Sequence, residues 1–263
     1  MRARVLSGDD LRDIAEARSI PLDQVEKDLL LLSMAARLVE RFPSQLCFKG
    51  GFVLRHGYGH DRFSGDVDAT RHNPARHKLD HEAVATEIKA AGRPLFSIRG
   101  MNMATNSARS LDFDDVRYRG PIGEGKVAIE VSYREDVLLE PIRLPMGVPF
   151  FDPFEVPTMA PPEMMAEKLR TLAQRRRPTD LLDAGMLLQG LAGAIEDPQV
   201  AGLVPTKFAS GLVRPGDHVR RIRANIHAMA TTYETVVRAV SPSAPSYEEM
   251  ASPILSRLPA FFQ

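Results

Sequence analysis

Apolar residues recur at helical spacing near the start of the chain and again in its last third. From Pro21 to Phe42-Pro43 they return every three or four residues, which predicts one long helix that begins at the proline. After Pro161-Pro162 the same period predicts a helix through Leu172 and a second helix that Thr179 caps. Further helices are predicted over residues 75–91, 198–212, 217–240 and 247–258.

Strand-like patterns fill the stretch between these helical regions. A short apolar run, Leu46 to Phe48, is stopped by Gly50-Gly51 and is followed by a predicted short helix from Phe52 to Tyr58. The stretch from Pro94 to Val156 is rich in alternating and β-branched segments separated by turn residues. It predicts strands over residues 95–99, 111–119, 126–134 and 138–144.

The order of these elements predicts an α+β fold in two parts. We expect an α/β domain over residues 1–157 and a helical domain over residues 158–263. The composition of the 263 residues is that of an ordinary globular protein, with 34 Lys and Arg against 34 Asp and Glu. This zero net charge argues against a protein that coats nucleic acid indiscriminately, although a local basic patch remains compatible with it.

The single cysteine, Cys47, bears on the cellular compartment. One cysteine excludes an intrachain disulfide framework, so a reducing compartment is expected, and the cytoplasm fits best. The longest apolar stretch, Leu29 to Val39, is interrupted by Ser33 and Arg37 and falls short of the roughly 20 residues that span a bilayer. We therefore expect no membrane helix, and the N-terminus predicts no secretory signal.

The most informative segment runs from Lys49 to Asp68. Residues two apart on a strand point to the same side, so Asp66 and Asp68 would present two carboxylates on one face. Such a pair suits Mg²⁺, which takes a few carboxylates and keeps positions for substrate phosphates. Gly50-Gly51 would let backbone N–H groups approach a phosphate, and Ser64, with the same strand parity, could donate a hydrogen bond to it.

A third carboxylate comes from the predicted strand over residues 126–134. Val127, Ile129 and Val131 form its apolar face, which places Glu130 on the other face. Glu130 would stand beside Asp66 and Asp68 if the two strands are neighbours, and it could then help to hold the metal. The alternative is a Glu on the solvent side of a half-buried strand, and the sequence leaves both open.

A local excess of positive charge lies in the helical part. Residues 168–223 contain ten basic and five acidic residues, an excess of five. Arg175, Arg176 and Arg177 in this segment could grip a nucleoside triphosphate or an RNA backbone. The alternative is a solvated helix face on which Asp180 merely complements a helix N-terminus.

Two separated motifs resemble one known family. Lys49-Gly50-Gly51-Phe52-Val53-Leu54, followed by Arg62-Phe63-Ser64-Gly65-Asp66-Val67-Asp68, is similar to the signature of the AbiEii/AbiGii-type nucleotidyltransferase toxins, which include the MenT toxins. Glu163-Met164-Met165-Ala166-Glu167-Lys168-Leu169, with residues 175–183 downstream, resembles the second signature of that family. The resemblance covers residues 21–191, and the last seventy residues add nothing diagnostic.

The resemblance implies a DNA-polymerase-β-like nucleotidyltransferase fold with a mixed β-sheet and a helical C-terminal part. It assigns Asp66 and Asp68 to the metal, and Lys168 with Asp180 or Asp183 to the completed site. The family commonly has Arg-Asp where this chain has Thr179-Asp180, so the resemblance does not choose between the two acids. The residues expected to bind the nucleotide are Lys49, Gly50, Gly51, Ser64 and Arg175.

The implied function is that of a toxin in a bacterial toxin–antitoxin system. Relatives transfer a nucleoside monophosphate from an NTP to RNA, some of them to the tRNA 3′ end, and so block translation. The resemblance thus implies Mg²⁺ or Mn²⁺ as cofactor, and an NTP, an RNA acceptor and a cognate antitoxin as partners. The alternatives are transfer to a small molecule or protein hydroxyl, and a catalytically silent nucleotide-binding module.

Overall fold

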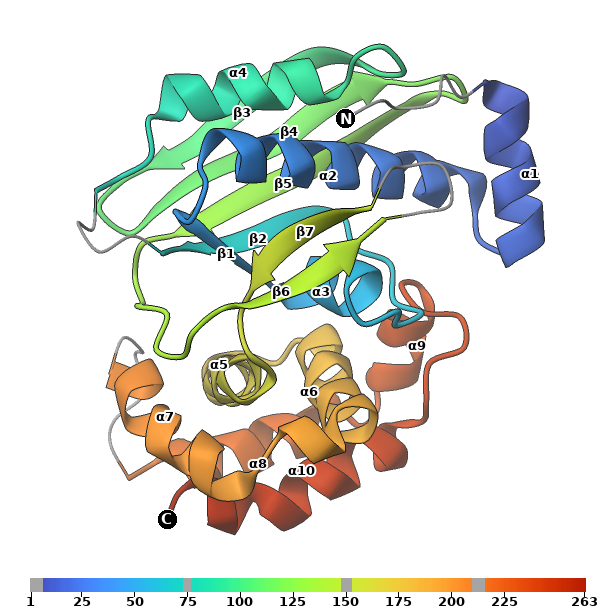
Figure 1. Ribbon diagram of the computed structural model, residues 1–263. Helices are drawn as coiled ribbons and strands as arrows, with labels where there is room; N and C mark the ends of the chain where they lie inside the picture. Colours follow the sequence, from blue (N-terminus) through green and yellow to red (C-terminus); the bar gives the residue numbers. More distant parts are fainter. Residues whose placement is uncertain (1–6, 73–76, 148–152, 210–215) are drawn as a thin grey trace. The chain divides into compact units, whose positions relative to one another are not determined.

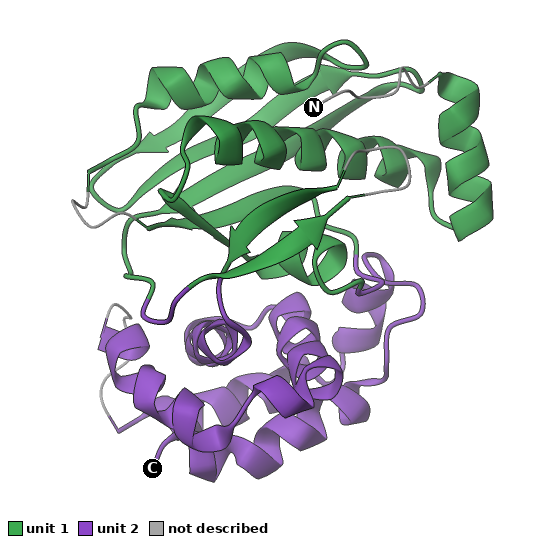
Figure 2. Ribbon diagram, in the orientation of Figure 1, with its two compact units in different colours: residues 1–59, 63–137, 141–158 green, residues 60–62, 138–140, 159–263 purple. Residues whose placement is uncertain are grey.

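The chain folds into two compact units, a sheet unit and a helical unit (Figures 1 and 2). The computed structural model describes residues 7–72, 77–147, 153–209 and 216–263. The sheet unit consists of residues 1–59, 63–137 and 141–158, and the helical unit of residues 60–62, 138–140 and 159–263. The main crossing between the units therefore follows Thr158, and two three-residue segments within the first part of the chain belong to the helical unit.

The sheet unit is built on seven strands in the order β3-β4-β5-β2-β1-β7-β6. The strands are β1 (Leu46–Lys49), β2 (Asp66–Arg71), β3 (Ser97–Asn106), β4 (Ser110–Arg119), β5 (Glu124–Ser132), β6 (Ile142–Met146) and β7 (Phe154–Thr158). β2 runs parallel to β5 and β1 runs parallel to β7, whereas the other neighbours are antiparallel. The predicted α+β class with a mixed sheet is confirmed.

Four helices belong to the sheet unit (Figure 1). They are α1 (Gly8–Arg18), α2 (Leu22–Arg41), α3 (Gly50–His56) and α4 (His81–Ala91). The long helix predicted after Pro21 is α2, and its leucines from Leu29 to Leu32 are fully or almost fully buried. α2 lies beside α4, because the Ser33 hydroxyl donates to the Ala91 carbonyl at 2.6 Å and Arg37 pairs with Glu87 at 2.7 Å.

Alternation along β2 and β5 separates an apolar face of the sheet from a polar one. Val67 and Ile129 are buried in the core, which accounts for the strand pattern seen in the sequence. The residues between them, Asp66 and Asp68 on β2 and Glu130 on β5, are exposed or half-buried on the opposite face. The candidate carboxylates therefore lie on the face opposite Val67 and Ile129, at the start of β2, whereas Thr70 further along the same face is fully buried.

The helical unit surrounds one central helix, α5 (Pro161–Gln174), with α6, α7 and α8 packed against it (Figure 1). The remaining elements are α6 (Pro178–Gly190), η1 (Ala192–Ala194), α7 (Asp197–Ala209), α8 (His218–Met229), α9 (Tyr233–Arg238) and α10 (Tyr247–Phe261). Met165, Leu169 and Leu172 of α5 are fully buried, so the helical period after Pro161-Pro162 marks the core of this unit.

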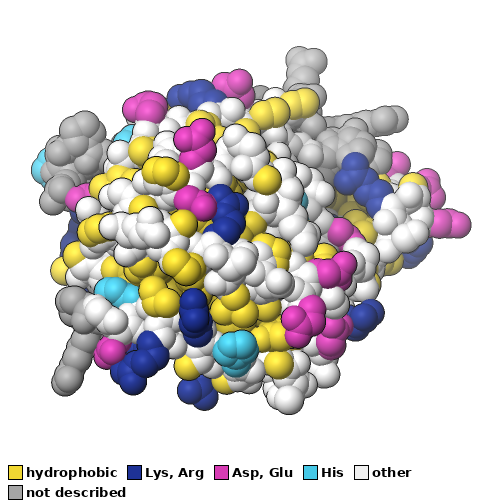
Figure 3. All heavy atoms as spheres, turned by 90° about the horizontal axis from the view of Figure 1, so that it is seen from below, with side chains coloured by type: hydrophobic (Ala, Val, Ile, Leu, Met, Phe, Trp, Pro, Cys, Tyr) yellow, Lys and Arg dark blue, Asp and Glu magenta, His cyan; other side chains and the backbone are white. Residues whose placement is uncertain are grey.

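An apolar hollow of about 690 Å³ lies between α7, α8 and α10 in the helical unit. Phe208 and Phe261 contribute to its walls, and the Phe208 and Phe262 rings meet edge to face at 5.4 Å between centroids. Figure 3 shows one face of the molecule, on which apolar side chains gather near the middle with Lys and Arg side chains at separate places around them.

Several boundaries differ from the sequence prediction. β3 runs to Asn106 rather than to residue 99, β6 begins at Ile142 rather than at residue 138, and α3 begins at Gly50 rather than at Phe52. The helix predicted over residues 198–212 is α7, and residues 210–212 lie outside the described residues. The helix expected over residues 75–91 begins only at His81, because the Asp80 carboxylate accepts the Glu82 N–H at 3.0 Å and caps it there; residues 75 and 76 lie outside the described residues. The helix expected over residues 217–240 is broken into α8 and α9 at residues 230–232. Thr179 lies inside α6 rather than at its cap, because the helix already begins at Pro178.

Besides the short η1, two elements lie outside the sequence predictions. α1 was not predicted, although Ser7 and Asp10 form a reciprocal capping box at its start. β7 was not predicted either, because Pro157 interrupts its strand pattern. β7 nevertheless pairs with β1 and β6, so it completes the sheet that carries the candidate site.

Candidate functional site

The two aspartates predicted to bind metal begin strand β2. Asp66 is exposed and Asp68 is half-buried, while Val67 between them is fully buried. Both carboxylates therefore belong to the same face of the sheet, as the spacing predicts. Because one carboxylate is exposed and the other is half-buried at the end of the strand, a cation can reach both without disturbing the packing of the core.

The strand register extends this pair into a polar row across the sheet. Asp68 lies opposite Lys49 of β1 on one side and opposite Glu130 of β5 on the other. Glu130 in turn lies opposite Asp112 of β4. Directly opposed residues share a face, so Lys49, Asp68, Glu130 and Asp112 form one row over four strands. The strands of Glu130 and Asp68 are thus neighbours, which is the condition that the sequence left open.

The donor chemistry of this face fits Mg²⁺ through the aspartate pair. Within the described ranges, no three His, Cys, Asp or Glu side chains gather into a group that could hold a metal. Glu130 pairs instead with Arg134 at 2.7 Å, with both side chains about half exposed. Mg²⁺ requires only one or two carboxylates when substrate phosphates and water complete its octahedron. Asp66 and Asp68 meet that requirement, and a metal role for Glu130 stays a prediction.

Asp112 is the acid that the sequence analysis missed. Its Oδ2 accepts the Ser110 hydroxyl at 2.8 Å, and its Oδ1 is buried without a hydrogen-bond partner among the described residues. The alternation Leu111, Asp112, Phe113 could have shown that it faces away from the core, because Leu111 and Phe113 are buried. It could not have shown the register, which long-range strand pairing decides.

Gly50 lies directly against the Asp68 carboxylate. Its φ of +71° is in the left-handed region, and a Cβ added to it would overlap the Asp68 Oδ2. Only glycine satisfies both conditions, because it has no Cβ. The Gly50-Gly51 step at the start of α3 therefore lets the backbone and the second aspartate approach each other closely.

A hydrogen-bonded chain behind β2 holds Ser64. The Ser64 side chain is 2% exposed, and its hydroxyl can donate to Asp66 Oδ1 at 3.0 Å or to the Asp66 carbonyl at 3.1 Å. The Gln24 amide donates to the Ser64 carbonyl at 3.3 Å and to Asp28 at 2.8 Å. Arg55 of α3 donates to the same Asp28 carboxylate. α2 and α3 thereby fix the turn that orients Asp66.

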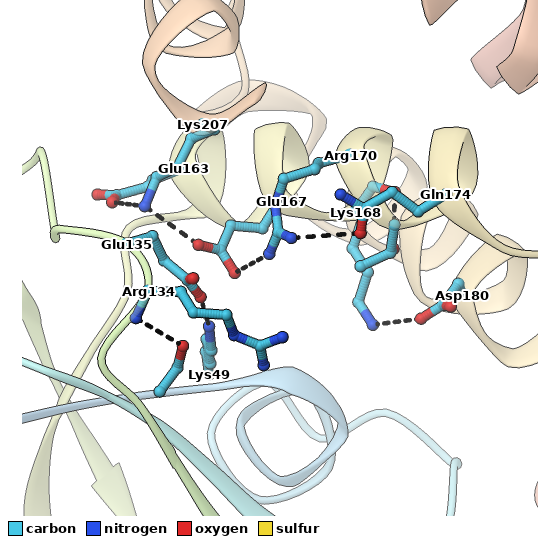
Figure 4. A network of polar contacts seen from close by, with 12 residues as sticks. Lys49, Arg134, Glu135, Glu163, Glu167, Lys168, Arg170, Gln174, Asp180 and Lys207 are labelled. Atoms are coloured by element: carbon cyan, nitrogen blue, oxygen red, sulfur yellow. Dashed lines mark hydrogen bonds and ion pairs between the residues drawn. The ribbon is translucent and has the colours of Figure 1, made fainter. Parts of the chain in front are cut away.

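A second charged cluster lies entirely within the helical unit, around Lys168 of α5 (Figure 4). The Lys168 Nζ lies 2.7 Å from Asp183 Oδ2 and 3.1 Å from Asp180 Oδ1. Arg62 pairs with Asp183 at 2.6 Å, and Arg175 pairs with Asp180 at 2.7 Å. Both acids that the resemblance left open therefore contact the same ammonium group.

These contacts keep the cluster ionised. Burial by itself raises the pKa of Asp180, but the charge of Lys168 and the hydrogen bonds of Arg175 outweigh it and lower the pKa to about 2. Burial lowers the pKa of Lys168, but Asp183 and Asp180 outweigh it and raise the pKa above its ordinary value. Lys168 is therefore a fixed cation at neutral pH.

Comparison with known proteins identifies the family. The family model of the nucleotidyl transferase AbiEii toxin, type IV toxin–antitoxin system, matches residues 34–256. The chain belongs to the AbiEii family of nucleotidyltransferase toxins. A search among curated protein sequences finds none that matches this chain. The predicted family and the predicted enzyme class are confirmed.

Solved structures share the fold of this AbiEii chain. MenT4, a nucleotidyltransferase toxin from Mycobacterium tuberculosis H37Rv, superposes with a TM-score of 0.69 at 20% identity, covering 98% of this chain and 90% of that one. JHP933 from Helicobacter pylori gives a TM-score of 0.63 at 16% identity, covering 91% and 92%. The fold predicted from the resemblance is thus confirmed over nearly the whole chain.

Membership of the AbiEii family identifies the biological system to which the chain belongs. The chain is a toxin of a type IV toxin–antitoxin system, and such a system includes an antitoxin partner. None of the helices in the described parts of the chain is both long and apolar enough to cross a membrane.

Other residues of the two AbiEii-like motifs have structural partners. The Lys49 Nζ lies 2.7 Å from the buried Glu135 carboxylate, so its predicted contact with the nucleotide stays a prediction (Figure 4). Glu163 is fully buried, where it pairs with Lys207 and accepts the N–H groups of Leu138 and Leu139 at 2.8 and 2.9 Å. Glu163 therefore connects Leu138 and Leu139 to α5.

Replacing Gly50 with alanine is expected to lower both stability and activity. A residue with a Cβ at positive φ costs about 1–2 kcal/mol, and the overlap with Asp68 adds displacement of that carboxylate. Gly59→Ala is the matched control, because Gly59 has φ +72° but open space around an added Cβ. Thermal melts should show a loss of stability in both variants, because both residues have positive φ. Transfer assays should show a loss of activity in Gly50→Ala alone. Equal activity of the two variants would contradict the assigned Gly50–Asp68 approach.

Acid is expected to weaken the helical unit through Asp180. Its folded-state pKa of about 2 lies below the ordinary 3.8, so its contribution is complete above pH 3.8 and is lost as the pH falls toward 2. The difference corresponds to about 2 kcal/mol. Urea unfolding at pH 4.5 and pH 2.5 should show a stability gap between wild type and Asp180→Asn that narrows in acid. A gap that is independent of pH would contradict the assigned ion pairs.

Proposed function

We propose that the chain transfers a nucleoside monophosphate from an NTP to an RNA acceptor, the 3′ end of tRNA, and thereby blocks translation. Asp66 and Asp68 would hold the required Mg²⁺, for which Mn²⁺ could substitute. The reaction would take place in the cytoplasm, where both tRNA and nucleoside triphosphates are available. The observation that carries the proposal is the pair of carboxylates on one face of β2, with Gly50 packed against the second of them.

The proposed chemistry is attack of an RNA hydroxyl on the α-phosphorus with loss of pyrophosphate. A bound Mg²⁺ would offset negative charge on the α-phosphate and on the leaving group. Ser64 orients Asp66 through its hydroxyl, and Gly50 keeps Asp68 close to the backbone at the start of α3. These contacts pre-position the acids, so catalysis rests on positioning and electrostatics rather than on a covalent intermediate.

Lys168 is proposed to bind the triphosphate as a point charge. An ammonium group has three N–H donors, and Asp180 and Asp183 account for two contacts. The third donor leaves capacity for one phosphate oxygen. We propose a supporting role for both acids, because each of them holds the ammonium group of Lys168.

Arg62 links this cluster to the acidic strand through the chain itself. Its ion pair with Asp183 anchors residue 62, and Asp66 follows only four residues later. The sequence between them contains Ser64, which orients Asp66. Arg62 is therefore proposed as a positioning residue for the reaction.

The excess of positive charge in residues 168–223 supports RNA as the acceptor. Ten basic against five acidic residues in an otherwise neutral chain favour a polyanionic partner for the helical unit. Not all ten of these basic residues are candidates for RNA contacts, because Lys168, Arg175 and Lys207 form ion pairs within the protein. The exposed arginines of α8 remain available to a polyanion.

Labelled nucleotides separate this proposal from its alternatives. The purified chain is incubated with each of four α-labelled NTPs and Mg²⁺, with and without total tRNA, and the label is followed by gel electrophoresis. Label on RNA is the expected result. Label on protein or on a small molecule would favour the second acceptor class, and NTP binding without transfer would indicate a silent nucleotide-binding module. Either of these two outcomes would overturn RNA as the acceptor.

A further inference from the structure

Three consecutive arginines after α5 take two different directions. Arg175 turns onto Asp180, with hydrogen bonds of 2.7 and 3.1 Å, and so belongs to the Lys168 cluster. Arg176 turns away to α8, where its Nε donates to Asn225 Oδ1 at 3.0 Å. The basic run therefore does not act as a unit, and Arg176 belongs to a different surface.

Arg176 and Arg221 are both tied to the C-terminal end of α5, Arg221 directly and Arg176 through Asn225. The Asn225 amide donates to the Leu172 carbonyl at 2.8 Å, and the Arg221 Nε donates to the Ala173 carbonyl at 3.3 Å. Asn225 thus fixes Arg176 beside the carbonyls that hold Arg221. Arg176 and Arg221 are exposed, and the Nε of each donates a hydrogen bond within the protein. Their guanidinium groups are therefore held in place at the surface.

This anchoring leaves phosphate-binding donors. Arg176 and Arg221 each use the Nε in the contacts described, and each guanidinium carries four further N–H donors on its two Nη atoms. A planar arginine fork matches the oxygens of a phosphate, and holding it in place lowers the entropy lost on binding. Two such groups anchored near the same turn of α5 suit a ligand that carries more than one phosphate.

Three more exposed arginines lie on α8 or next to Arg176 in the chain. Arg177, Arg220 and Arg223 are exposed, and with Arg176 and Arg221 they form what we call the α8 arginine surface. Asp217, which pairs with Arg220 at 2.8 Å, is the only acidic residue in the sequence from 216 to 230. The surface is therefore strongly positive although the chain as a whole is neutral.

The large apolar side chains of α8 lie away from these arginines. Ile222, Ile226 and Met229 are almost fully buried in the helical unit, and Val219 lines the apolar hollow that α8 shares with α7 and α10. Protein interfaces depend on buried apolar or aromatic anchors at their centre, whereas nucleic-acid affinity depends on arginines and lysines that face phosphates. An extended set of exposed arginines also matches the repeating phosphates of a strand better than the compact triphosphate of one nucleotide.

We propose that the α8 arginine surface binds the phosphate backbone of the RNA acceptor. This inference rests on the proposed function, which it deepens by naming where the acceptor is held. It predicts that these arginines set the affinity for RNA but not the affinity for NTP. It also predicts that Arg175 does not bind RNA, although it is adjacent to Arg176 and Arg177 in the sequence.

The test compares RNA binding of the full-length chain and its variants across a salt series. Two double variants each remove two positive charges: Arg176→Gln/Arg221→Gln and Arg177→Gln/Arg223→Gln. The second variant leaves the anchoring hydrogen bonds of Arg176 and Arg221 intact, so it remains informative if the first variant fails to fold. Fluorescence anisotropy with labelled tRNA should show affinity lowered about tenfold or more, and a salt slope reduced by about 1.4 for two lost contacts. Affinity for NTP should change less than twofold. Arg12→Gln/Arg238→Gln is the control, because both side chains are exposed and lie elsewhere in the chain.

Three results would overturn the inference. Unchanged tRNA affinity and salt slope in both folded variant pairs would remove the surface from RNA binding, while transfer to RNA by the wild type would leave the proposed function intact. Wild-type chain that neither binds nor labels RNA would overturn both. Unchanged RNA affinity together with lost binding of polyglutamate would assign the surface to an acidic protein partner instead.

Discussion

Replacing Asp66 or Asp68 with asparagine is expected to lower nucleotidyl transfer by at least about 1,000-fold, and to abolish growth inhibition. Each change removes one negative charge from the two-carboxylate set that fits Mg²⁺. Loss of several kcal/mol of transition-state stabilisation corresponds to this factor, because each 1.36 kcal/mol is tenfold in rate. Transfer should be measured by single-turnover labelling at saturating NTP and RNA.

Both variants should remain folded. Asp66 is exposed and Asp68 is half-buried, so neither contributes an apolar contact to the core. Glu124→Gln is a matched control, because Glu124 is an exposed acid at the start of β5 in the same sheet. Wild-type transfer by a folded Asp66→Asn protein would refute the site assignment, and equal loss in Glu124→Gln would show that the effect is not specific to the pair.

Replacing Lys168 with methionine is expected to lower transfer at least about 100-fold and also to destabilise the helical unit. Asp180 and Asp183 are buried, and removing their shared cation leaves two carboxylates close together, with Arg62 and Arg175 as their remaining ion-pair partners among the described residues. Breaking a buried ion pair from one side costs about 3–5 kcal/mol. Thermal melts and transfer rates should both be recorded.

A double variant separates stability from activity at Lys168. Lys168→Met/Asp183→Asn removes the uncompensated charge, so much of the lost stability should return while transfer remains low. Lys168→Arg keeps the charge and is expected to retain the fold better than Lys168→Met. Recovery of transfer in the double variant would contradict a direct role for Lys168 in binding the triphosphate.

Local patterns predicted the elements that carry the site. The alternation around Val67 and Ile129 placed the candidate acids on the polar side of their strands, because burial of one face imposes a period of two. The glycine pair after Phe48 predicted a strand, a turn and a short helix, and β1 and α3 occupy those positions. These features depend on a few consecutive residues, so the sequence alone was sufficient.

Long-range contacts could not be predicted in the same way. Whether Glu130 is a neighbour of Asp68 depends on β2 pairing with β5, and the sequence is compatible with other strand orders. The partner of Arg175 is Asp180, five residues later, whereas that of Arg176 is Asn225 on α8. Three identical residue types in a row therefore have different roles, which tertiary packing decides and composition does not.

Helix ends also show the difference between local patterns, which are readable in the sequence, and tertiary contacts, which are not. The capping box of Ser7 and Asp10 is readable in the sequence, but α1 is short and only Leu11 and Ile14 are buried, so its apolar period is weak. The break between α8 and α9 follows Met229 without proline or glycine, and the carbonyl of Met229 accepts the Thr232 hydroxyl at 3.3 Å. Such a break arises from side-chain contacts with the backbone, which hydrophobic periodicity does not reveal.

Sequencing of RNA 3′ ends after exposure to the purified chain tests the proposed function most directly. Total tRNA is incubated with the wild-type chain, all four NTPs and Mg²⁺, and Asp66→Asn protein is treated in parallel. We expect added nucleotides at tRNA 3′ ends with the wild-type chain and unchanged ends with the variant. Unchanged 3′ ends in both samples, while the folded wild-type chain still inhibits growth, would contradict the proposed function.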